Sequence, residues 1–379
     1  MHYKNDERNE RGSMNILVGM SGGVDSSVTA LLLKEVGHNV IGATMAIWGK
    51  DGVYKEIQEK ISGLQKKQTH SACFGPDEKE DIESAEKICS QLNIPFYVFD
   101  CAKQYEEIVL KNFKEEYLNG RTPNPCILCN SLIKFDVLPY LAKLNGINFD
   151  KFATGHYARI EERNGKYLLK RGISDKKDQS YFLYKLKQEQ LKNILLPLGD
   201  YTKEQIREIA TNHGLIVADK PDSQDFYEGD YNELLGVKDK IGNIIDIQGN
   251  VLGKHNGIWN YTIGQRKGLG ISSTEALYVI ELKKDTNEVV VGFKDKTLKN
   301  ELIATKMNWI AIDKPNHTFN CYAKIRSSQE LQEVEIEPYG ENEIKAKFTN
   351  LQKSISLGQS IVLYQGDIVL GGGIIDKVL

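Results

Sequence analysis

The sequence lacks a hydrophobic run long enough to cross a membrane, has few cysteines and carries no large excess of charge. A membrane helix needs about 20 apolar residues, and the first segment, MHYKNDERNERGS, is too polar for a signal peptide. Six cysteines in 379 residues are too few for a secreted disulfide scaffold, and a net charge of −3 does not indicate a nucleic-acid partner. We therefore expect a cytoplasmic protein with no membrane segment, in which free thiols are available for chemistry or metal binding.

The chain is long enough for two or three domains. Residues 1–13 are expected to be disordered or a tag. Strand and helix patterns alternate over residues 14–200, which predicts an α/β domain with a parallel sheet and ligands at the carboxyl ends of its strands. The expected strands are 16–20, 39–44, a buried strand at 94–99, and 149–154; the expected helices are 76–92, 105–118 and 132–144.

The pattern changes near residue 200. The segment 219–268 is rich in Gly, Asp and Asn, and we interpret residues 201–270 as a small central linker domain. Residues 271–379 contain short strand patterns separated by turn residues, which favours an antiparallel β-barrel. The expected strands of this barrel are a hairpin at 276–284 and 288–293, followed by 319–325, 333–338, 344–349 and 361–364.

The strongest single motif is SGGVDSS at positions 21–27, between an apolar strand and a helical segment that Ser26 or Ser27 would cap. A glycine turn at the start of a helix presents backbone N–H groups and a positive helix end, which suits a phosphate. The motif has neither the Gly-Lys-Ser/Thr of a Walker loop nor the G-x-G-x-x-G dinucleotide pattern. It therefore predicts a different kind of phosphate loop.

A second motif, TPNPCILCN at positions 122–130, places Cys126 and Cys129 three residues apart in an expected loop that leads into a helix. Such a pair can provide a nucleophile, bind a soft metal, or consist of two structural thiols. The residues alone leave these uses open. Cys89, Cys101 and Cys321 lie in apolar patterns and are interpreted as core thiols.

Three further strings contain candidate ligand residues. In TGHYAR (154–159), the missing side chain of Gly155 could admit adenine or ribose, whereas His156 is better interpreted as a hydrogen-bonded structural residue. In KKDQS (176–180), Lys177 could hold phosphate, and Asp178 and Gln179 could bond a base edge. GQRKGLG (264–270) suits RNA backbone contact or a solvated loop equally well.

Taken in order, these strings resemble the tRNA-specific 2-thiouridylase family of the N-type ATP pyrophosphatase (PP-loop) superfamily. The resemblance extends over nearly the whole chain from residue 14. The matching strings are GMSGGVDSS, GATM with Met45, TPNPCILCN, TGHYAR, KKDQSYFL, PDSQD at 221–225, GQRKGLG and AKIRSS at 323–328.

The resemblance implies that ATP is used to adenylate the 2-carbonyl oxygen of the wobble uridine in the tRNA anticodon, and that a sulfur on Cys129 displaces AMP. Asp25 would help to hold Mg²⁺. The implied ATP-binding residues are Gly19, Met20, Ser21, Gly22, Gly23, Val24, Asp25 and Ser26, with Met45 and Gly155 near the adenosine. The implied tRNA-binding residues are Asn124, Pro125, Cys126, Lys177, Asp178, Gln179, Arg326 and Ser327. The sulfur would come from a donor protein or from sulfide.

The chain departs from the family pattern at two positions. Many members have Asp where this chain has Cys126, and many have a second catalytic cysteine shortly after the motif at 222–225, where this chain has none. Either Cys126 replaces that cysteine or the sulfur is delivered differently. Our hypothesis for the second case is a [4Fe-4S] cluster held by Cys73, Cys126 and Cys129.

Two other functions stay open from the sequence. One is another AMP-forming PP-loop enzyme or tRNA modifier, and the other is a non-catalytic RNA-binding or metal-sensing relative.

Overall fold

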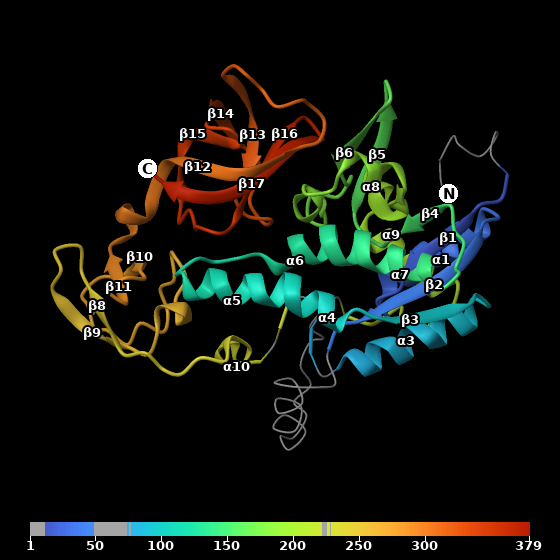
Figure 1. Cartoon of the computed structure of the whole chain (residues 1–379), viewed down its shortest axis with the longest axis horizontal. Coiled ribbons are helices and arrows are strands. Elements are labelled where there is room, and N and C mark those ends of the chain that lie inside the picture. The colour runs from blue at the N-terminus through green and yellow to red at the C-terminus, as the bar shows by residue number, and fades with distance from the viewer. Residues whose placement is uncertain (1–11, 49–73, 76, 222–225, 228) are drawn as a thin grey trace. The chain divides into compact units, whose positions relative to one another are not determined.

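The computed structural model describes residues 12–48, 74–75, 77–221, 226–227 and 229–379. These fall into two compact units (Figure 1). The first contains the residues up to Val109 together with Cys126–Gly229, and the second contains Leu110–Pro125 with Asp230–Leu379. Cys73, most of the expected N-terminal tail and the motif at 222–225 lie outside the described residues.

The first unit is built on a five-stranded parallel sheet with the order β3-β2-β1-β4-β7. Ile16, Leu17 and Val18 of the central strand are fully buried, because a parallel sheet is covered on both faces. This confirms the predicted parallel α/β domain. The strands are β1 (Asn15–Gly19), β2 (Asn39–Ala46), β3 (Phe96–Asp100), β4 (Lys151–Ala153) and β7 (Ile194–Leu195).

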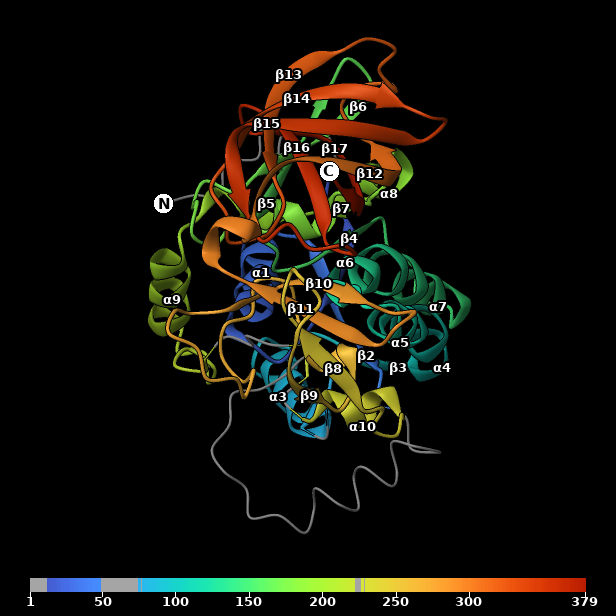
Figure 2. The ribbon, with the colours of Figure 1, turned by 90° about the vertical axis from the view of Figure 1, so that its left-hand side faces the viewer.

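Helices cover both faces of this sheet (Figure 2). Helices α1, α3 and α9 share a core with Ile16 and Val18 on one face, and α7 contacts β2 and β3 on the other. The unit's longer helical segments are α1 (Val24–Glu35), α3 (Glu78–Gln91), α4 (Ala102–Tyr105), η2 (Glu106–Leu110), α6 (Pro125–Leu128), η3 (Cys129–Val137), α7 (Leu138–Leu144), α8 (Gln188–Lys192) and α9 (Lys203–Asn212). Short 3-10 turns are η4 (Ser180–Leu183) and η5 (Pro197–Asp200), and β5 (Ala158–Arg163) pairs with β6 (Lys166–Arg171) as an antiparallel hairpin that the sequence analysis missed.

Three local predictions for this unit were wrong. Strand β3 lies at the end of the described sheet, so Tyr97 and Val98 are 44% and 47% exposed instead of buried. Helix α1 begins after Gly23, so Ser26 lies in its first turn and does not cap it. Cys126 and Cys129 lie inside a continuous helical segment and not in a loop, because Pro125 starts that segment, where a missing N–H costs nothing.

The second unit contains a small four-stranded sheet with the order β10-β11-β8-β9. Its core includes Ile244, Val279, Val289 and Val291. The expected hairpin is present, but it belongs to this sheet and not to the barrel, because β11 pairs with β8. The elements are α5 (Lys111–Leu118), α10 (Tyr231–Leu235), β8 (Gly242–Ile245), β9 (Val251–His255), η6 (Ile258–Asn260), β10 (Tyr278–Lys283), β11 (Glu288–Gly292) and η7 (Lys294–Thr297).

The C-terminal strands of the second unit form an antiparallel barrel with the order β12-β15-β14-β13-β16-β17, which pairing of β12 with β17 closes. The barrel was predicted, but its two long closing strands, β12 and β17, were not. Apolar side chains such as Leu302, Phe348 and Leu363 fill its core. The strands are β12 (Leu298–Trp309), β13 (Phe319–Lys324), β14 (Gln332–Tyr339), β15 (Glu343–Lys353), β16 (Ser360–Gln365) and β17 (Ile368–Val378).

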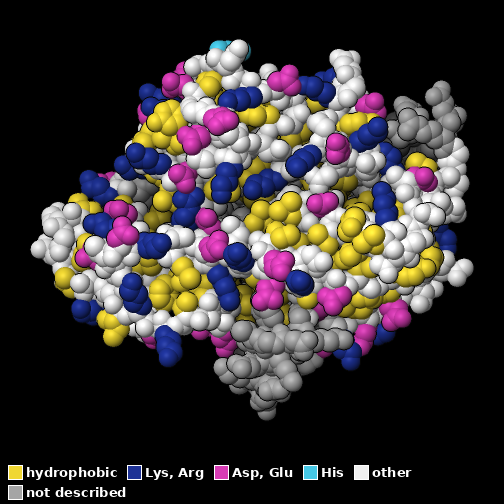
Figure 3. All heavy atoms as spheres, in the orientation of Figure 1, with side chains coloured by type: hydrophobic (Ala, Val, Ile, Leu, Met, Phe, Trp, Pro, Cys, Tyr) yellow, Lys and Arg dark blue, Asp and Glu magenta, His cyan; other side chains and the backbone are white. Residues whose placement is uncertain are grey.

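One described helix, Pro125–Leu144, is long and apolar enough to span a membrane on length and composition alone, although no such run was expected. Buried core helices meet the same criterion. This one buries Ile133, Phe135 and Leu138 and contacts the sheet, so we interpret it as a core helix. Acidic and basic side chains are interspersed over the face shown in Figure 3, as the small net charge suggests.

The glycine turn after β1 gives a test of the fold. Gly22 has φ +71°, and a Cβ there would lie 2.3 Å from the backbone oxygen of Asp81. We expect Gly22→Ala to lower the free energy of unfolding by about 2–4 kcal/mol, because the left-handed conformation and the clash both oppose a side chain. Denaturant titration would measure the loss.

Gly37→Ala is the matched control, since Gly37 has φ +92° and no atom within 4 Å of its Cβ position. Gly37→Ala should lower the free energy of unfolding by only about 1 kcal/mol, because only the backbone conformation opposes the side chain. Equal losses in the two variants would show that the close approach of α3 to the turn is unimportant.

Candidate functional site

The glycine turn is held by serine hydroxyls of the first helical turn. Ser26 Oγ accepts from the backbone N–H of Ser21 and donates to the carbonyl of Gly23, each at 3.2 Å. Ser27 Oγ donates to the same carbonyl at 2.8 Å. The turn is thereby fixed at the N-terminus of a 12-residue helix, which is the arrangement that binds phosphate groups.

Asp25 is tied to two distant segments. Lys203 Nζ donates to Asp25 Oδ1 at 2.8 Å and to Oδ2 at 2.9 Å, and the Tyr157 hydroxyl donates to Oδ1 at 2.7 Å. The Lys203 side chain is only 9% exposed. A cation bound directly to this carboxylate would have to compete with Lys203, and the expected part of Asp25 in holding Mg²⁺ stays a prediction.

Gly155 lies against the backbone of the phosphate turn. A Cβ on it would lie 2.8 Å from the carbonyl carbon of Asp25 and 2.9 Å from the backbone nitrogen of Ser26. The missing side chain thus allows the segment after β4 to approach the backbone of the phosphate turn. Gly155 also lines the cavity, so a position near adenosine stays a prediction.

A second cation lies beside the turn. Lys220 Nζ donates to Asp81 Oδ1 at 2.7 Å and to the carbonyl of Gly22 at 3.1 Å, and Ser84 donates to that carbonyl at 3.2 Å. Lys220 immediately precedes the PDSQD string. These contacts fasten both α3 and the segment at 220 to the glycine turn.

A cavity of about 380 Å³ opens at the carboxyl ends of β1, β2 and β4. Its volume suits a small-molecule ligand. The predicted residues that line it are Gly19, Met20, Ser21, Gly23, Val24, Asp25, Ser26, Met45, Cys126, Cys129, Gly155, Lys177 and Gln179. Further lining residues that sequence reasoning missed include Thr44, Ile47, Glu78, Asp81, Tyr105, Lys134, Thr154, Lys220 and Phe226.

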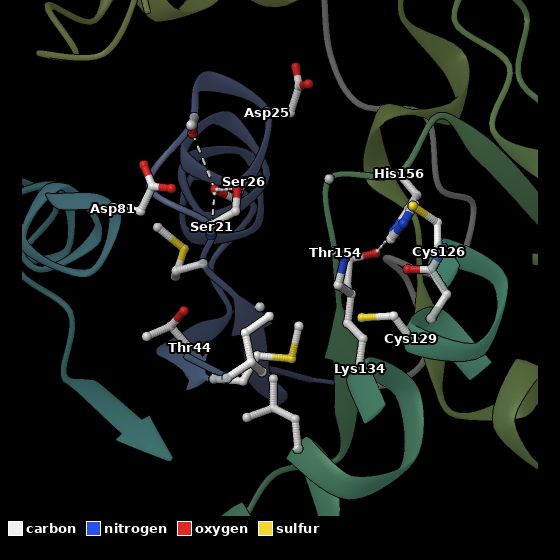
Figure 4. A pocket seen from close by; sticks show the side chains of 18 of the residues that line it. Ser21, Asp25, Ser26, Thr44, Asp81, Cys126, Cys129, Lys134, Thr154 and His156 are labelled. Atoms are coloured by element: carbon white, nitrogen blue, oxygen red, sulfur yellow. Dashed lines mark hydrogen bonds between the residues drawn. The ribbon is translucent and has the colours of Figure 1, made fainter. Parts of the chain in front are cut away.

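The two halves of the cavity carry different chemistry. In Figure 4, Ser21, Ser26, Asp25 and Asp81 lie on one side and Cys126, Cys129, Lys134 and His156 on the other. Cys126 and Cys129 are partly exposed. The phosphate turn and the thiol pair therefore share one cavity, as a reaction that joins nucleotide and sulfur chemistry would require.

The other described cysteines are buried, as predicted. Burial raises the pKa of Cys89, Cys101 and Cys321 to about 12 each. For Cys101 the charges of Asp100, Cys129 and Glu78 add to that rise in pKa. These three thiols stay protonated at neutral pH and are poor nucleophiles.

His156 is buried and hydrogen-bonded, as expected. Its Nδ1 lies 2.7 Å from Thr154 Oγ1. Burial, with the charge of Lys134 as a second cause, holds the pKa of His156 well below its usual value. His156 is therefore neutral at pH 7.

Glu78 shapes the cavity wall beyond β2. One of its oxygens accepts the backbone N–H groups of Ile47 at 2.6 Å and Trp48 at 3.0 Å. Burial raises the pKa of Glu78, and the two N–H groups oppose that rise.

The expected tRNA-binding residues divide into three groups. Lys177 and Gln179 line the cavity. Asp178 has a fully buried side chain that accepts from Arg171 and from the backbone N–H groups of Gly172 and Ser180, so it shapes the loop and is not placed to contact a base. Asn124, Pro125, Arg326 and Ser327 belong to the second unit, and their contact with tRNA stays a prediction.

The residues for the proposed cluster are incompletely described. Cys126 and Cys129 line the cavity, whereas Cys73 lies outside the described residues. Within the part of the chain that the structure describes, no group of three or more His, Cys, Asp or Glu side chains could hold a metal ion. The cluster stays a hypothesis.

Comparison with known proteins gives matches along nearly the whole chain. Family models described as a tRNA methyl transferase HUP domain, a tRNA methyl transferase PRC-barrel domain and an aminomethyltransferase β-barrel domain match residues 14–227, 233–293 and 299–375. A tRNA-specific 2-thiouridylase of Endomicrobium trichonymphae is 48% identical over 96% of this chain and 99% of its own. A protein of the same name from Clostridioides difficile is 45% identical over 96% of this chain and 98% of its own.

Among solved structures, the U34-tRNA thiolase NcsA from Methanococcus maripaludis with its [4Fe-4S] cluster is 19% identical, with a TM-score of 0.34. The match covers 60% of this chain and 65% of the other. A likeness at that level carries no inference about function.

The ion pair between Lys203 and Asp25 gives a stability prediction. Lys203→Met should lower the free energy of unfolding by about 2 kcal/mol, because it leaves a half-buried carboxylate without its cation. Denaturant titration would measure the loss. The loss should shrink in an Asp25→Asn background, which has no carboxylate charge to compensate.

Lys79→Met is the control for this prediction. Lys79 also lies in a helix, but its side chain is 86% exposed and its distance to Glu83 is 3.9 Å. Its substitution should change stability by less than about 0.5 kcal/mol. A Lys203 variant as stable as this control would contradict the structural role of the ion pair.

Proposed function

Because the chain belongs to the tRNA-specific 2-thiouridylase family, we propose that its cavity performs both halves of uridine thiolation. ATP adenylates the 2-carbonyl oxygen of the wobble uridine of tRNA, and pyrophosphate leaves. Sulfur then attaches to C2, the C2–O bond breaks, and AMP leaves with the electron pair. The observation that carries the proposal is the presence of the phosphate turn and of Cys126 and Cys129 in one cavity.

The first half-reaction depends on the turn at residues 21–26. The positive end of α1 and the N–H groups of the turn suit the phosphates of ATP. Met45 and Ile47, at the carboxyl end of β2, give apolar surface for adenine. Mg²⁺ supplies charge neutralisation to the phosphates, and we expect it to arrive bound to ATP, since Lys203 occupies the Asp25 carboxylate.

The target base must leave the anticodon stack to reach the cavity. Tyr105 and Phe226 line the cavity, and Phe74 stacks on both, with ring centroids 5.3 Å and 5.8 Å away. Aromatic faces of this kind suit a flipped pyrimidine. Gln179 and Lys177 are the candidates for contact with the nucleotide.

Two sulfur routes fit the thiol pair. In the persulfide route, the terminal sulfur on Cys129 bonds to C2, and the Cys126 thiol then attacks the Cys129 sulfur. The S–S bond breaks and 2-thiouridine is released. A thiol reductant then reduces the resulting Cys126–Cys129 disulfide to two thiols. In the other route, a cluster on Cys73, Cys126 and Cys129 would supply a bound sulfide.

Iron and sulfide analysis after anaerobic purification separates these routes. Bound iron would support the cluster, and its absence would leave the persulfide route. In the persulfide route the donor is a sulfur-carrying protein whose persulfide passes its outer sulfur to the Cys129 thiolate and keeps a thiol, whereas in the cluster route sulfide itself is the donor. The chain is expected to act in the cytoplasm.

Other functions make different predictions. Another AMP-forming enzyme of the superfamily would consume ATP without sulfur incorporation into tRNA, and a non-catalytic relative would bind RNA without consuming ATP. The matching domain families are named after methyl transfer, but a loop that suits a triphosphate favours ATP-dependent chemistry.

The decisive measurement is mass analysis of tRNA nucleosides after incubation with ATP, Mg²⁺ and either sulfide or a low-molecular-weight persulfide, so that both sulfur routes are supplied. Wild-type protein should form 2-thiouridine, and Cys129→Ala should form at least about 1000-fold less, because it lacks the sulfur carrier. ATP binding, measured by calorimetry, should change less than about threefold in the variant.

Cys321→Ala is the control, since this buried thiol of the barrel does not line the cavity. It should retain thiolation. Undiminished thiolation by Cys129→Ala would exclude Cys129 as the carrier, and a wild-type protein that makes no 2-thiouridine would overturn the proposed function itself.

A further inference from the structure

Lys134 is a cation of the cavity that the proposed mechanism has not used. It lies in η3, is half-buried and lines the cavity on the side of the thiols. Over the described residues, its ammonium makes no hydrogen bond or ion pair. Placing a charged group in a half-buried position without a partner is unfavourable, which suggests that it meets an anion during function.

The acidic groups of the cavity already have partners. Asp25 accepts from Lys203, Asp81 accepts from Lys220, and Glu78 accepts from two backbone N–H groups. The positive charge of Lys134 is thus left uncompensated and favours an anionic ligand.

The neighbours of Lys134 are neutral. In Figure 4 its side chain extends past Cys129 toward the hydrogen-bonded pair of Thr154 and His156. His156 carries no charge at pH 7, so it neither repels the Lys134 ammonium nor adds a second positive charge. Lys134 therefore places a positive charge beside neutral side chains on the thiol side of the described cavity wall.

The helix geometry sets Lys134 beside Cys129. Residues 129–137 form a π-helix, whose hydrogen bonds join residues five apart. Cys129 and Lys134 are five apart, so they project to the same side. A π-helical segment of this kind is frequently found at functional sites.

We propose that Lys134 is a catalytic residue of the sulfur-transfer half-reaction, where its ammonium binds the phosphate of the adenylated uridine and stabilises AMP as it leaves. The inference rests on the proposed function. As the C2–O bond breaks, the electron pair moves to an oxygen of AMP, whose negative charge increases. A fixed ammonium in a partly dry cavity stabilises such developing charge strongly.

The position of Lys134 assigns it to this step and not to ATP binding. Figure 4 places it across the cavity from Ser21, Ser26 and Asp25, on the side where sulfur attacks. The phosphate turn and Lys220 lie on the opposite side and serve the pyrophosphate end. Loss of Lys134 should leave adenylation largely intact.

The test is a single-turnover assay with full-length protein, tRNA, labelled ATP, Mg²⁺ and the sulfur source that supports 2-thiouridine formation by the wild type (sulfide or a low-molecular-weight persulfide), in which pyrophosphate and AMP release are timed separately. In Lys134→Met, pyrophosphate release and ATP affinity should stay within about threefold of wild type. AMP release and 2-thiouridine formation should fall about 100-fold or more, and adenylated tRNA should accumulate. Lys134→Arg, which keeps the charge, should retain at least about one tenth of the rate.

Lys143→Met is the matched control on the same helical segment, since Lys143 lies over the Phe149 ring and does not line the cavity. It should behave as wild type. Unchanged AMP release in Lys134→Met, or an equal fall in pyrophosphate release, would overturn the inference.

Lys134→Gln provides a second, polar variant that should give the same separation of the two steps if Lys134→Met does not fold. Failure of the proposed function is a distinct outcome, because it would appear in the wild-type protein as absence of 2-thiouridine.

Discussion

The carboxylate of Asp25 connects three segments of the nucleotide-binding unit, and the rest of the site depends on these connections. It lies in the first turn of α1, while Lys203 and Tyr157 come from α9 and from the segment after β4. Two donors and both carboxylate oxygens fix the relative positions of these three segments. Gly155 lets the segment after β4 approach the backbone of the same turn. The phosphate turn is thus held by its surroundings as well as by its own serines, and a preorganised turn binds phosphate with little loss of conformational freedom.

Charge is distributed unevenly between the two sides of the cavity. On the phosphate side, Asp25 and Asp81 neutralise Lys203 and Lys220 and leave helix α1 and backbone N–H groups to bind the nucleotide. On the thiol side, a neutral histidine and the Lys134 ammonium adjoin Cys126 and Cys129. This arrangement suits a sequence of steps in which pyrophosphate leaves at one side and AMP is released toward the other.

Much of the architecture could be predicted from the sequence because it depends on local patterns. The alternation of apolar strands and helices gave the parallel sheet, and GGVDSS located the phosphate turn. The pairing of Lys203 with Asp25 could not be predicted, because the two are separated by 178 positions and periodicity carries no information about such contacts. For the same reason the close approach of Gly155 to the phosphate turn and the burial of the Asp178 side chain could not be predicted, since each depends on which segment packs beside it.

Other features that the sequence analysis missed, a hairpin and two cavity residues, have a recognisable signal in the sequence. Asn164 and Gly165, both with positive φ, form the turn of the β5–β6 hairpin, and Asn-Gly is a strong hairpin signal. Thr44 and Ile47 could have been predicted as cavity residues, because they lie at the carboxyl end of β2, where ligands of parallel sheets bind.

The π-helical turn at residues 129–137 makes the alignment of thiol and ammonium depend on chain length. In an ordinary α-helix, with 3.6 residues per turn, positions five apart would project about 140° from each other. Removal of one residue between Cys129 and Lys134 would leave them four positions apart, and in an ordinary α-helix they would then still project within about 40° of each other. Insertion of one residue would instead place them six apart and rotate the ammonium about 120° away from the thiol. This stretch should therefore tolerate the loss of one residue far more readily than the gain of one.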